Sequence, residues 1–164
     1  MTASAASGAL LSWSILVAAV GAGLTAGVFL AFSTFVMTGL GRAPAAAGVR
    51  AMQEINRAAP SPVFMLTLFG TAVLAVGLAV TAVVSRGPAW GWVVGGAAAY
   101  LVCVLLTVGY HVPRNEALAT LDPADPGTLE AWRTYLVDWT RLNHLRTLSA
   151  AAGSVLLLLS RWPS

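Results

Sequence analysis

The stretch Arg141-Leu-Asn-His-Leu-Arg-Thr-Leu-Ser-Ala-Ala-Ala-Gly-Ser-Val-Leu-Leu-Leu-Leu-Ser160 decides how this chain folds. Its uncharged part, residues 147–160, would rise only about 21 Å as an α-helix. The hydrocarbon core of a bilayer is about 30 Å thick and takes roughly 20 residues. Since only four residues follow the stretch, the missing length has to come from the polar residues at its N-terminal end. A membrane-spanning helix here must carry Asn143, His144 and Arg146 to the membrane boundary or just inside it.

The composition also indicates an integral membrane protein. The chain has 164 residues, of which 58% are hydrophobic and only 9% are charged, whereas soluble domains average about 25% charged residues. The net charge of +3 is spread without a basic run, so nothing indicates a nucleic-acid partner. Cys103 is the only cysteine, which excludes a disulfide framework. The partner that this composition requires is the lipid bilayer.

Hydrophobic segments predict an all-α integral membrane four-helix bundle, with residues 1–164 as one domain. The four spans are expected at about 10–40, 60–84, 90–111 and 141–160. For the second span, Ser61 can cap the helix and Pro62 can occupy its first position. Pro113 lacks a backbone donor and should kink or end the third span.

The links between the spans differ in length, and this difference predicts the topology. The links at 41–59 and 112–140 are long and polar and should carry short extra helices, one at about 48–58 and one that begins at the Asp-Pro pairs 122–123 and 125–126. With four spans, both long links lie on one face and both termini on the other. Most of the nine arginines fall on the long-link face. The positive-inside rule therefore predicts a multi-pass protein of the cell membrane with its long links in the cytoplasm.

Small residues recur at the spacing that lets membrane helices approach closely. The pairs are Gly23 with Gly27, Gly91 with Gly95, and Ser149 with Gly153. Such pairs predict tight packing inside one bundle, and they leave a homo-oligomer open as the alternative.

A polar and aromatic stripe runs into the fourth span. Its members are Trp132, Tyr135, Trp139, Asn143 and Arg146, separated by 3, 4, 4 and 3 residues. At this spacing they share one helical face. The alternatives are interfacial anchoring for the aromatic residues and snorkelling to lipid headgroups for Arg146. Ionisable groups inside a membrane more often mark a pathway or a reaction site.

Further polar residues lie in the long links. Gln53 and Asn56 share one side of the helix expected at 48–58, and two neutral amides suit the recognition of carbonyl or hydroxyl groups; a solvated surface helix is the alternative. His111 and Asn115 flank Pro113 at the exit of the third span. Both histidines and every acidic residue lie between residues 54 and 144, so we expect one polar site on the long-link face.

Five motifs resemble those of a four-span membrane family that includes the anthrone oxygenases. They are Ala26-Gly-Val-Phe-Leu-Ala-Phe-Ser33, Met52-Gln-Glu-Ile-Asn56, Pro62-Val-Phe64, Val112-Pro-Arg-Asn115 and Trp139-Thr-Arg-Leu-Asn-His-Leu-Arg146. The resemblance implies a four-helix membrane protein that oxidises a polycyclic phenolic anthrone of the polyketide type to a quinone with O₂. The recurrent polar positions of the family correspond to Gln53, Asn56, Asn115, Trp139, Asn143 and Arg146, with His144 beside them. Arg114 departs from the family pattern, which usually has a neutral residue there.

The first functional hypothesis is a membrane-embedded oxygenase that needs no cofactor and acts on a flat, apolar aromatic substrate. Loss of a proton from an anthrone gives an electron-rich enolate, which can reduce O₂ without a metal. Such an enzyme needs a base, and it needs donors for the enolate oxygen. We expect His144 as the base with His111 as second choice, and Arg146 and Asn143 as the oxyanion donors. The expected substrate-binding residues are Gln53, Asn56, His111, Asn115 and Trp139, the last by stacking on the ring.

Two other hypotheses remain. A metal or a haem could be held by His111 and His144, with Glu54 as a further metal ligand. No pair has the local HxxxH or HxxE spacing of metal ligands, so this signal is weak. Alternatively, the chain could be a non-enzymatic small-molecule binder or a membrane assembly protein, in which the polar cluster only holds the bundle together.

Overall fold

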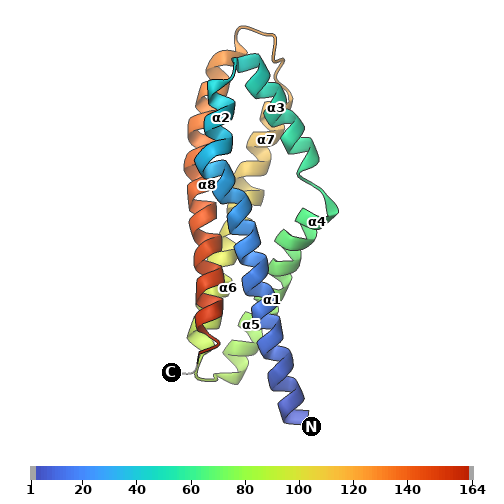
Figure 1. The fold of residues 1–164 in the computed structure, drawn as a ribbon, viewed down its shortest axis with the longest axis vertical. Helices are drawn as coiled ribbons and strands as arrows, with labels where there is room; N and C mark the ends of the chain where they lie inside the picture. Colours follow the sequence, from blue (N-terminus) through green and yellow to red (C-terminus); the bar gives the residue numbers. More distant parts are fainter. Residues whose placement is uncertain (1–2, 163–164) are drawn as a thin grey trace.

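The computed structural model describes residues 3–162, and all regular secondary structure in this range is helical. The helices form an elongated bundle (Figure 1). Four of them are long and apolar enough to cross a membrane: Ala6–Arg42, Pro62–Ser85, Trp90–Ala119 and Thr128–Leu159. The chain is therefore a multi-pass, all-α membrane protein, as the sequence predicts.

Three of the four spans are interrupted by a π-helical turn. η1 (Phe32–Val36) joins α1 (Ala3–Ala31) to α2 (Met37–Arg42), η2 (Leu66–Gly70) joins α4 (Pro62–Met65) to α5 (Thr71–Ser85), and η3 (Thr107–His111) joins α6 (Trp90–Leu106) to α7 (Val112–Ala119). A π turn widens the helix locally and changes which backbone groups pair, and such turns are frequent at functional sites. All three turns are adjacent to the cavity described below.

Pro113 does not end the third span. A proline inside an α-helix clashes with the carbonyl group four residues earlier. Here the π turn η3 directly precedes α7, in which Pro113 occupies the first turn, and the widened backbone accommodates the ring. The helix continues to Ala119, so of the two effects predicted for Pro113, a kink or an end, the end does not occur.

The long links contain the predicted helices. α3 (Ala45–Ala58) covers the segment expected at 48–58. The side chains of Asp122 and Asp125 accept hydrogen bonds from the backbone N–H groups of Ala124 and Gly127, at 2.9 and 2.8 Å, and these turns lead into α8 (Thr128–Leu159). α8 then runs without a break into the fourth span, whose helix begins before residue 141. Ser61 caps α4 as predicted, accepting a hydrogen bond from the backbone N–H of Phe64 at 3.4 Å.

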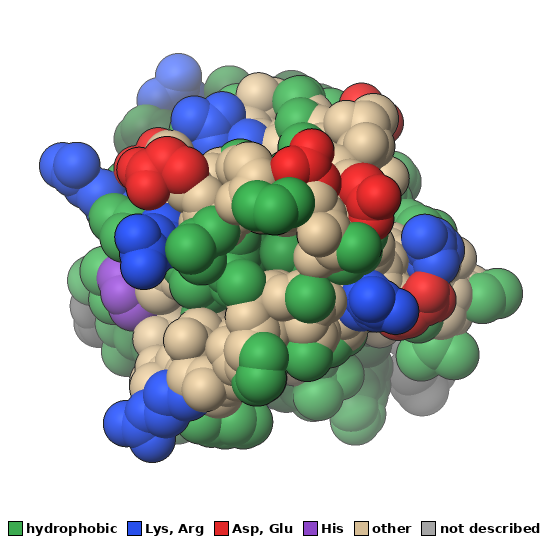
Figure 2. Space-filling model, turned by 90° about the horizontal axis from the view of Figure 1, so that it is seen from above, with side chains coloured by type: hydrophobic (Ala, Val, Ile, Leu, Met, Phe, Trp, Pro, Cys, Tyr) green, Lys and Arg blue, Asp and Glu red, His purple; other side chains and the backbone are tan. Residues whose placement is uncertain are grey.

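The two ends of the bundle differ in chemistry. Both termini lie at one end, and α2, α3, α7 and the start of α8 gather at the other (Figure 1). Seen from that second end, arginine and acidic side chains surround an apolar centre (Figure 2). α3 leans away from the bundle axis as it runs from the end with the long links, and the chain turns back towards the axis through α4 and α5 (Figure 1). Residues from the end of α3 and from α4 line the cavity described below.

A close helix contact joins α6 to α8 at two glycines. A Cβ atom on Gly96 would lie 2.9 Å from Leu157 Cγ and 3.1 Å from the Gly153 carbonyl oxygen, so no larger residue fits without movement. The same test at Gly91 finds no atom within 4 Å. The small-residue packing predicted for α8 therefore uses Gly153, which meets Gly96 of α6.

Candidate functional site

A cavity of about 620 Å³ lies in the half of the bundle nearer the long links. Its walls come from α1 and η1, from α3, α4 and η2, from η3 and α7, and from α8. Aromatic rings form much of the surface: Phe29, Phe32, Phe64, Phe69 and Trp139. The rings of Phe32 and Trp139 pack at 5.5 Å between centroids, and those of Phe29 and Phe64 meet edge to face at 6.2 Å. The cavity is thus wide, apolar and suited to a flat hydrophobic molecule.

The polar residues predicted for a single site mostly meet in this cavity. Six of them contribute to its lining: Gln53, Asn56, His111, Asn115, Trp139 and Arg146. The helical face predicted for α8 is also present, because Trp132, Tyr135, Trp139, Asn143 and Arg146 are all buried. The polar groups therefore lie inside the apolar chamber rather than on a solvated surface.

Arg146 is a buried cation without an anionic partner on the described residues. Its side chain is 4% exposed. Nε and Nη2 donate to Asn143 Oδ1 at 3.1 and 2.7 Å, and Nη1 donates to Thr107 Oγ1 at 3.4 Å. The guanidinium carbon lies 3.8 Å from the centre of the Phe29 ring, within the range of a cation–π contact. Ion pairs among residues 3–162 join Arg57 to Glu54 and Arg133 to Glu130, both on the surface, so the charge of Arg146 stays unneutralised.

Asn143 holds Arg146 in place. The Asn143 side chain is fully buried, and its Nδ2 donates to the Phe29 carbonyl oxygen and to Ser33 Oγ, both at 2.8 Å. Its oxygen accepts the two bonds from Arg146. Because both N–H groups of the amide are used within the protein, and Asn143 does not line the cavity, it cannot be the direct oxyanion donor that the sequence predicted. It acts on the site through Arg146.

Asn115 presents a fixed amide donor to the cavity. Its Oδ1 accepts hydrogen bonds from the Tyr135 hydroxyl at 2.8 Å and from Trp139 Nε1 at 2.9 Å. An indole N–H can only donate, so the atom that faces it must be the amide oxygen and not the nitrogen. The orientation of the Asn115 amide is therefore settled by its neighbours, and its Nδ2 has no acceptor on the described residues.

Asn56 and Gln53 enter the cavity from α3. Asn56 Nδ2 is buried, yet it has no hydrogen-bond partner among the described residues, a situation that costs about 1–3 kcal/mol when nothing else binds. Gln53 differs, because its Nε2 donates to the carbonyl oxygens of Leu118 and Leu121, each at 3.0 Å. Gln53 thus ties α3 to the end of α7, and only its oxygen remains for a ligand.

His111 is fully buried and joins η3 to α8. Its Nδ1 lies 2.9 Å from the Leu106 carbonyl oxygen and its Nε2 lies 3.3 Å from the Trp139 carbonyl oxygen. The imidazole also meets the Trp139 ring edge to face at 5.0 Å. Since both nitrogens face backbone carbonyl groups, neither has a lone pair directed at a ligand. The geometry suits a structural bridge better than a catalytic base.

Comparison with known protein families identifies the family of this chain. The sequence model of the family described as anthrone oxygenase matches residues 61–156, more than half of the chain. This protein belongs to the anthrone oxygenase family. The matched region contains α4 to α7 and most of α8, and with them Asn115, Trp139, Asn143 and Arg146; Gln53 and Asn56 precede it. No curated protein and no solved structure matches the chain.

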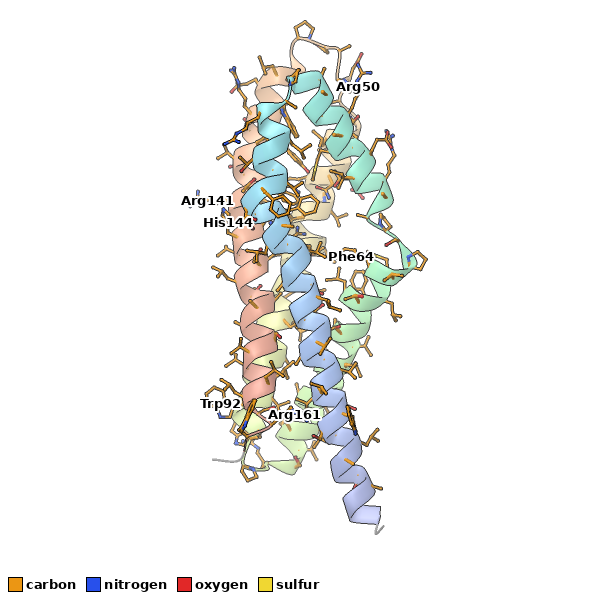
Figure 3. All side chains as sticks on the ribbon, in the orientation of Figure 1. Arg50, Phe64, Trp92, Arg141, His144 and Arg161 are labelled. Carbon is orange, nitrogen blue, oxygen red and sulfur yellow. The ribbon has the colours of Figure 1, made fainter. Side chains whose placement is uncertain are left out.

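Among the site residues predicted from the sequence, His144 is the one whose position differs most from expectation. Its side chain is exposed and lies beside Arg141 in a separate groove of about 370 Å³ between α2 and α8. Figure 3 shows both side chains projecting from one side of the bundle, whereas Phe64 of the cavity lies towards the other. One residue step turns a helix by about 100°, so the neighbour of the buried Asn143 points outward. The structure does not bring His144 to the cavity.

The metal ligands considered for the sequence are also not brought together. Residues 3–162 contain no group of three or more His, Cys, Asp or Glu side chains that could hold a metal ion. Glu54 pairs with Arg57 on the surface, His144 faces outward, and both ring nitrogens of His111 face backbone carbonyl oxygens. The set of His111, His144 and Glu54 therefore does not form a metal site in this fold.

Several residues of the site were not predicted. Phe29, Phe32 and Phe64 form aromatic walls, Thr107 accepts a bond from Arg146, and Tyr135 orients Asn115. The phenylalanines lie in the family motifs quoted above, which was a usable signal. Thr107 carried none, because a threonine in an apolar span usually bonds to its own helix.

Proposed function

We propose that this protein oxidises an anthrone-type substrate, a polycyclic phenolic ketone of the aromatic polyketide class, to the corresponding quinone with O₂. One observation carries the proposal: a buried arginine without a protein anion lines an aromatic-walled cavity in a member of the anthrone oxygenase family. The aromatic rings are suited to pack against a flat polycycle. Arg146 is suited to the oxygen at which negative charge develops.

The proposed reaction balances without an external reductant. The ring CH₂ group of the anthrone becomes a C=O group, one atom of O₂ enters that carbonyl, and the other leaves as water with the two hydrogens of the CH₂. Loss of one of these hydrogens as a proton gives an enolate, whose electrons pass to O₂. Arg146, Asn115 and Asn56 would hold the enolate oxygen, and Gln53 Oε1 could accept a hydrogen bond from a phenol hydroxyl elsewhere on the ring.

A turnover assay tests this function. The protein, purified in detergent or reconstituted in nanodiscs, is given a hydroxylated anthrone, while quinone absorbance and O₂ uptake are followed together. Quinone and O₂ uptake should appear in a one-to-one ratio, well above the spontaneous oxidation measured with empty nanodiscs. A folded protein that adds nothing to the spontaneous rate would refute the proposal. Elemental analysis and a visible spectrum of the same sample decide between a cofactor-free reaction and one with a bound metal or haem.

We further propose that the protein lies in the cell membrane. The surplus of arginines at the end with the long links supports an orientation with that end in the cytoplasm. Single-cysteine labelling of intact cells tests this orientation. Cys103 is buried, so an added surface cysteine provides the reactive thiol. With a membrane-impermeant reagent, Gly87→Cys, at the end with the termini, should react from outside, and Asp125→Cys should not. The opposite result would invert the topology.

A further inference from the structure

We infer that the cavity binds its substrate as an anion, and that Arg146 together with the amide donors of Asn56 and Asn115, rather than a protein base, brings about ionisation on binding. The inference rests on the proposed function for the identity of the substrate, but not for the chemistry of the cavity. The class of ligand is a phenol or enol of a flat polycyclic ring whose oxygen becomes negative.

The first argument is the kind of hydrogen bond that the cavity can still make. Arg146 has more N–H groups than the three bonds to Asn143 and Thr107 use. Asn115 has an oriented Nδ2, because its oxygen is already held by Tyr135 and Trp139. Asn56 Nδ2 is buried and makes no hydrogen bond of normal geometry to the described residues, although its side chain lies near enough to the Tyr135 hydroxyl to interact with it. These three groups are donors, and Gln53 Oε1 is left as an acceptor. A ligand therefore has to supply an acceptor to the three donors, and an oxyanion is the strongest acceptor available.

The second argument is the charge balance around the cavity. On α8, Arg146 is buried and bonded only to neutral partners, and the titratable side chains that interact with its charge are Cys103 of α6 and Tyr135 of α8. On η3, both nitrogens of His111 face carbonyl oxygens. At the rim, Glu116 of α7 is exposed, and Arg57 of α3 is exposed and paired with Glu54.

The buried interior therefore contains a positive charge and no described carboxylate. An opposite charge within about 4–6 Å favours the ionised form of an acid, commonly by about 1–3 pKa units. A phenol or enol bound beside Arg146 thus loses its proton more readily than the same molecule in lipid or water. The proton passes to bulk water through the rim. No side chain has to act as a base in the cavity, which agrees with the outward position of His144.

A coloured product-like probe tests the inference without turnover. 2-Hydroxyanthraquinone already has the quinone oxidation state, and its phenol and phenolate forms absorb at different wavelengths. Its absorbance is titrated against pH in nanodiscs that contain the wild-type protein and in empty nanodiscs. We expect the pH of half-ionisation to be lower by about 1–3 units when the probe is bound to the protein. An unchanged or higher value, or failure of the protein to bind the phenolate, would overturn the inference.

Matched variants identify the groups responsible. Arg146→Gln should abolish the decrease in the half-ionisation pH of the bound probe, whereas Arg146→Lys, which keeps the charge, should retain part of this decrease. Glu116→Gln should leave it intact; if it abolished the lowering, Glu116 would be a protein base and the inference would be wrong. Asn56→Leu is expected to fold, because Asn56 Nδ2 makes no hydrogen bond of normal geometry to the described residues. With this variant, the half-ionisation pH of the bound probe should decrease less than with the wild-type protein. The same decrease as in the wild type would contradict the role given to the amide donors.

The outcomes separate this inference from the proposed function. A lowered half-ionisation pH without anthrone turnover would retain the anion site and exclude the oxygenase. Turnover without the lowering would retain the oxygenase and exclude ionisation by Arg146.

Discussion

The guanidinium of Arg146 donates two hydrogen bonds to the amide oxygen of Asn143, which lies one turn earlier on α8, at 3.1 Å from Nε and 2.7 Å from Nη2. A carboxylate at this position would neutralise the charge, whereas an amide fixes the direction of the guanidinium and leaves its charge in place. Asn143 is in turn fixed by its bonds to Phe29 and Ser33. The pair therefore presents an oriented positive charge in an apolar chamber, where electrostatic interactions are strong.

The first prediction concerns Arg146→Leu. Turnover should fall by about 10²–10³-fold, the usual cost of removing one donor to a developing oxyanion. Membrane insertion should not suffer, because leucine is favoured in the fourth span and arginine is not. Anthrone turnover per folded protein measures the effect, with Arg141→Leu on the outer side of α8 as the control. Full turnover in Arg146→Leu would mean that the arginine only anchors the helix.

The second prediction separates the two histidines. His144→Gln should turn over at close to the wild-type rate, because His144 lies outside the cavity. A loss of about 10²–10⁴-fold, typical of removing a general base, would contradict this placement.

His111→Gln should instead destabilise the protein, because it disrupts the contacts to the Leu106 and Trp139 carbonyl groups. A neutral imidazole has one N–H and so donates one of these two bonds. Its loss costs about 0.5–1.5 kcal/mol in the free energy of unfolding. Thermal unfolding in detergent should therefore shift downward for His111→Gln and stay constant for His144→Gln. An unchanged unfolding temperature in His111→Gln would argue against the bridging role.

Much of the fold could be predicted because it depends on local patterns. The length of the apolar runs gives the four spans, Ser61 and Pro62 mark the start of α4, and the spacing from Trp132 to Arg146 gives the buried face of α8. The π turns could not be predicted in the same way. π turns are rare and frequently occur at functional sites, and whether one forms depends on tertiary contacts such as that of His111 with Trp139 of α8.

The candidate site, like the fold, could be predicted only in part. Residue type and spacing identified the amides and the arginine, since polar groups in an apolar span are conspicuous. Their roles depend on hydrogen bonds between residues far apart in the sequence. The Asn143 amide nitrogen donates to Phe29 and Ser33, and the Asn115 amide oxygen accepts from Tyr135 and Trp139. The sequence prediction put His144 in the site, but the structure places it outside the cavity. Proximity in sequence to Arg146 says little about which side of the helix faces the cavity.

The third prediction tests the contact between α6 and α8. Gly96→Ala should destabilise the bundle by about 1–3 kcal/mol, the usual cost of overpacking, because the added Cβ would meet Leu157 and the Gly153 backbone at 2.9–3.1 Å. Gly91→Ala is the matched control on the same helix, since its Cβ would meet nothing within 4 Å. Unfolding in detergent measures both. Equal stability of the two variants would show that α6 and α8 do not approach as closely as described.

The last prediction concerns Asn56, whose buried Nδ2 has no partner among residues 3–162. Leucine has nearly the same shape as asparagine but no group that needs a hydrogen bond. Asn56→Leu should therefore stabilise the ligand-free protein by up to about 1–3 kcal/mol, the cost of an unsatisfied buried donor. It should also weaken substrate binding, because the ligand loses a donor. Thermal unfolding without ligand and the KM for the anthrone measure the two effects, with Gln53→Leu as the contrasting variant. Gln53 donates to Leu118 and Leu121, so its replacement should lower stability instead. If Asn56→Leu lost stability as Gln53→Leu does, the Asn56 amide would have a structural partner, and its place in the ligand site would have to be given up.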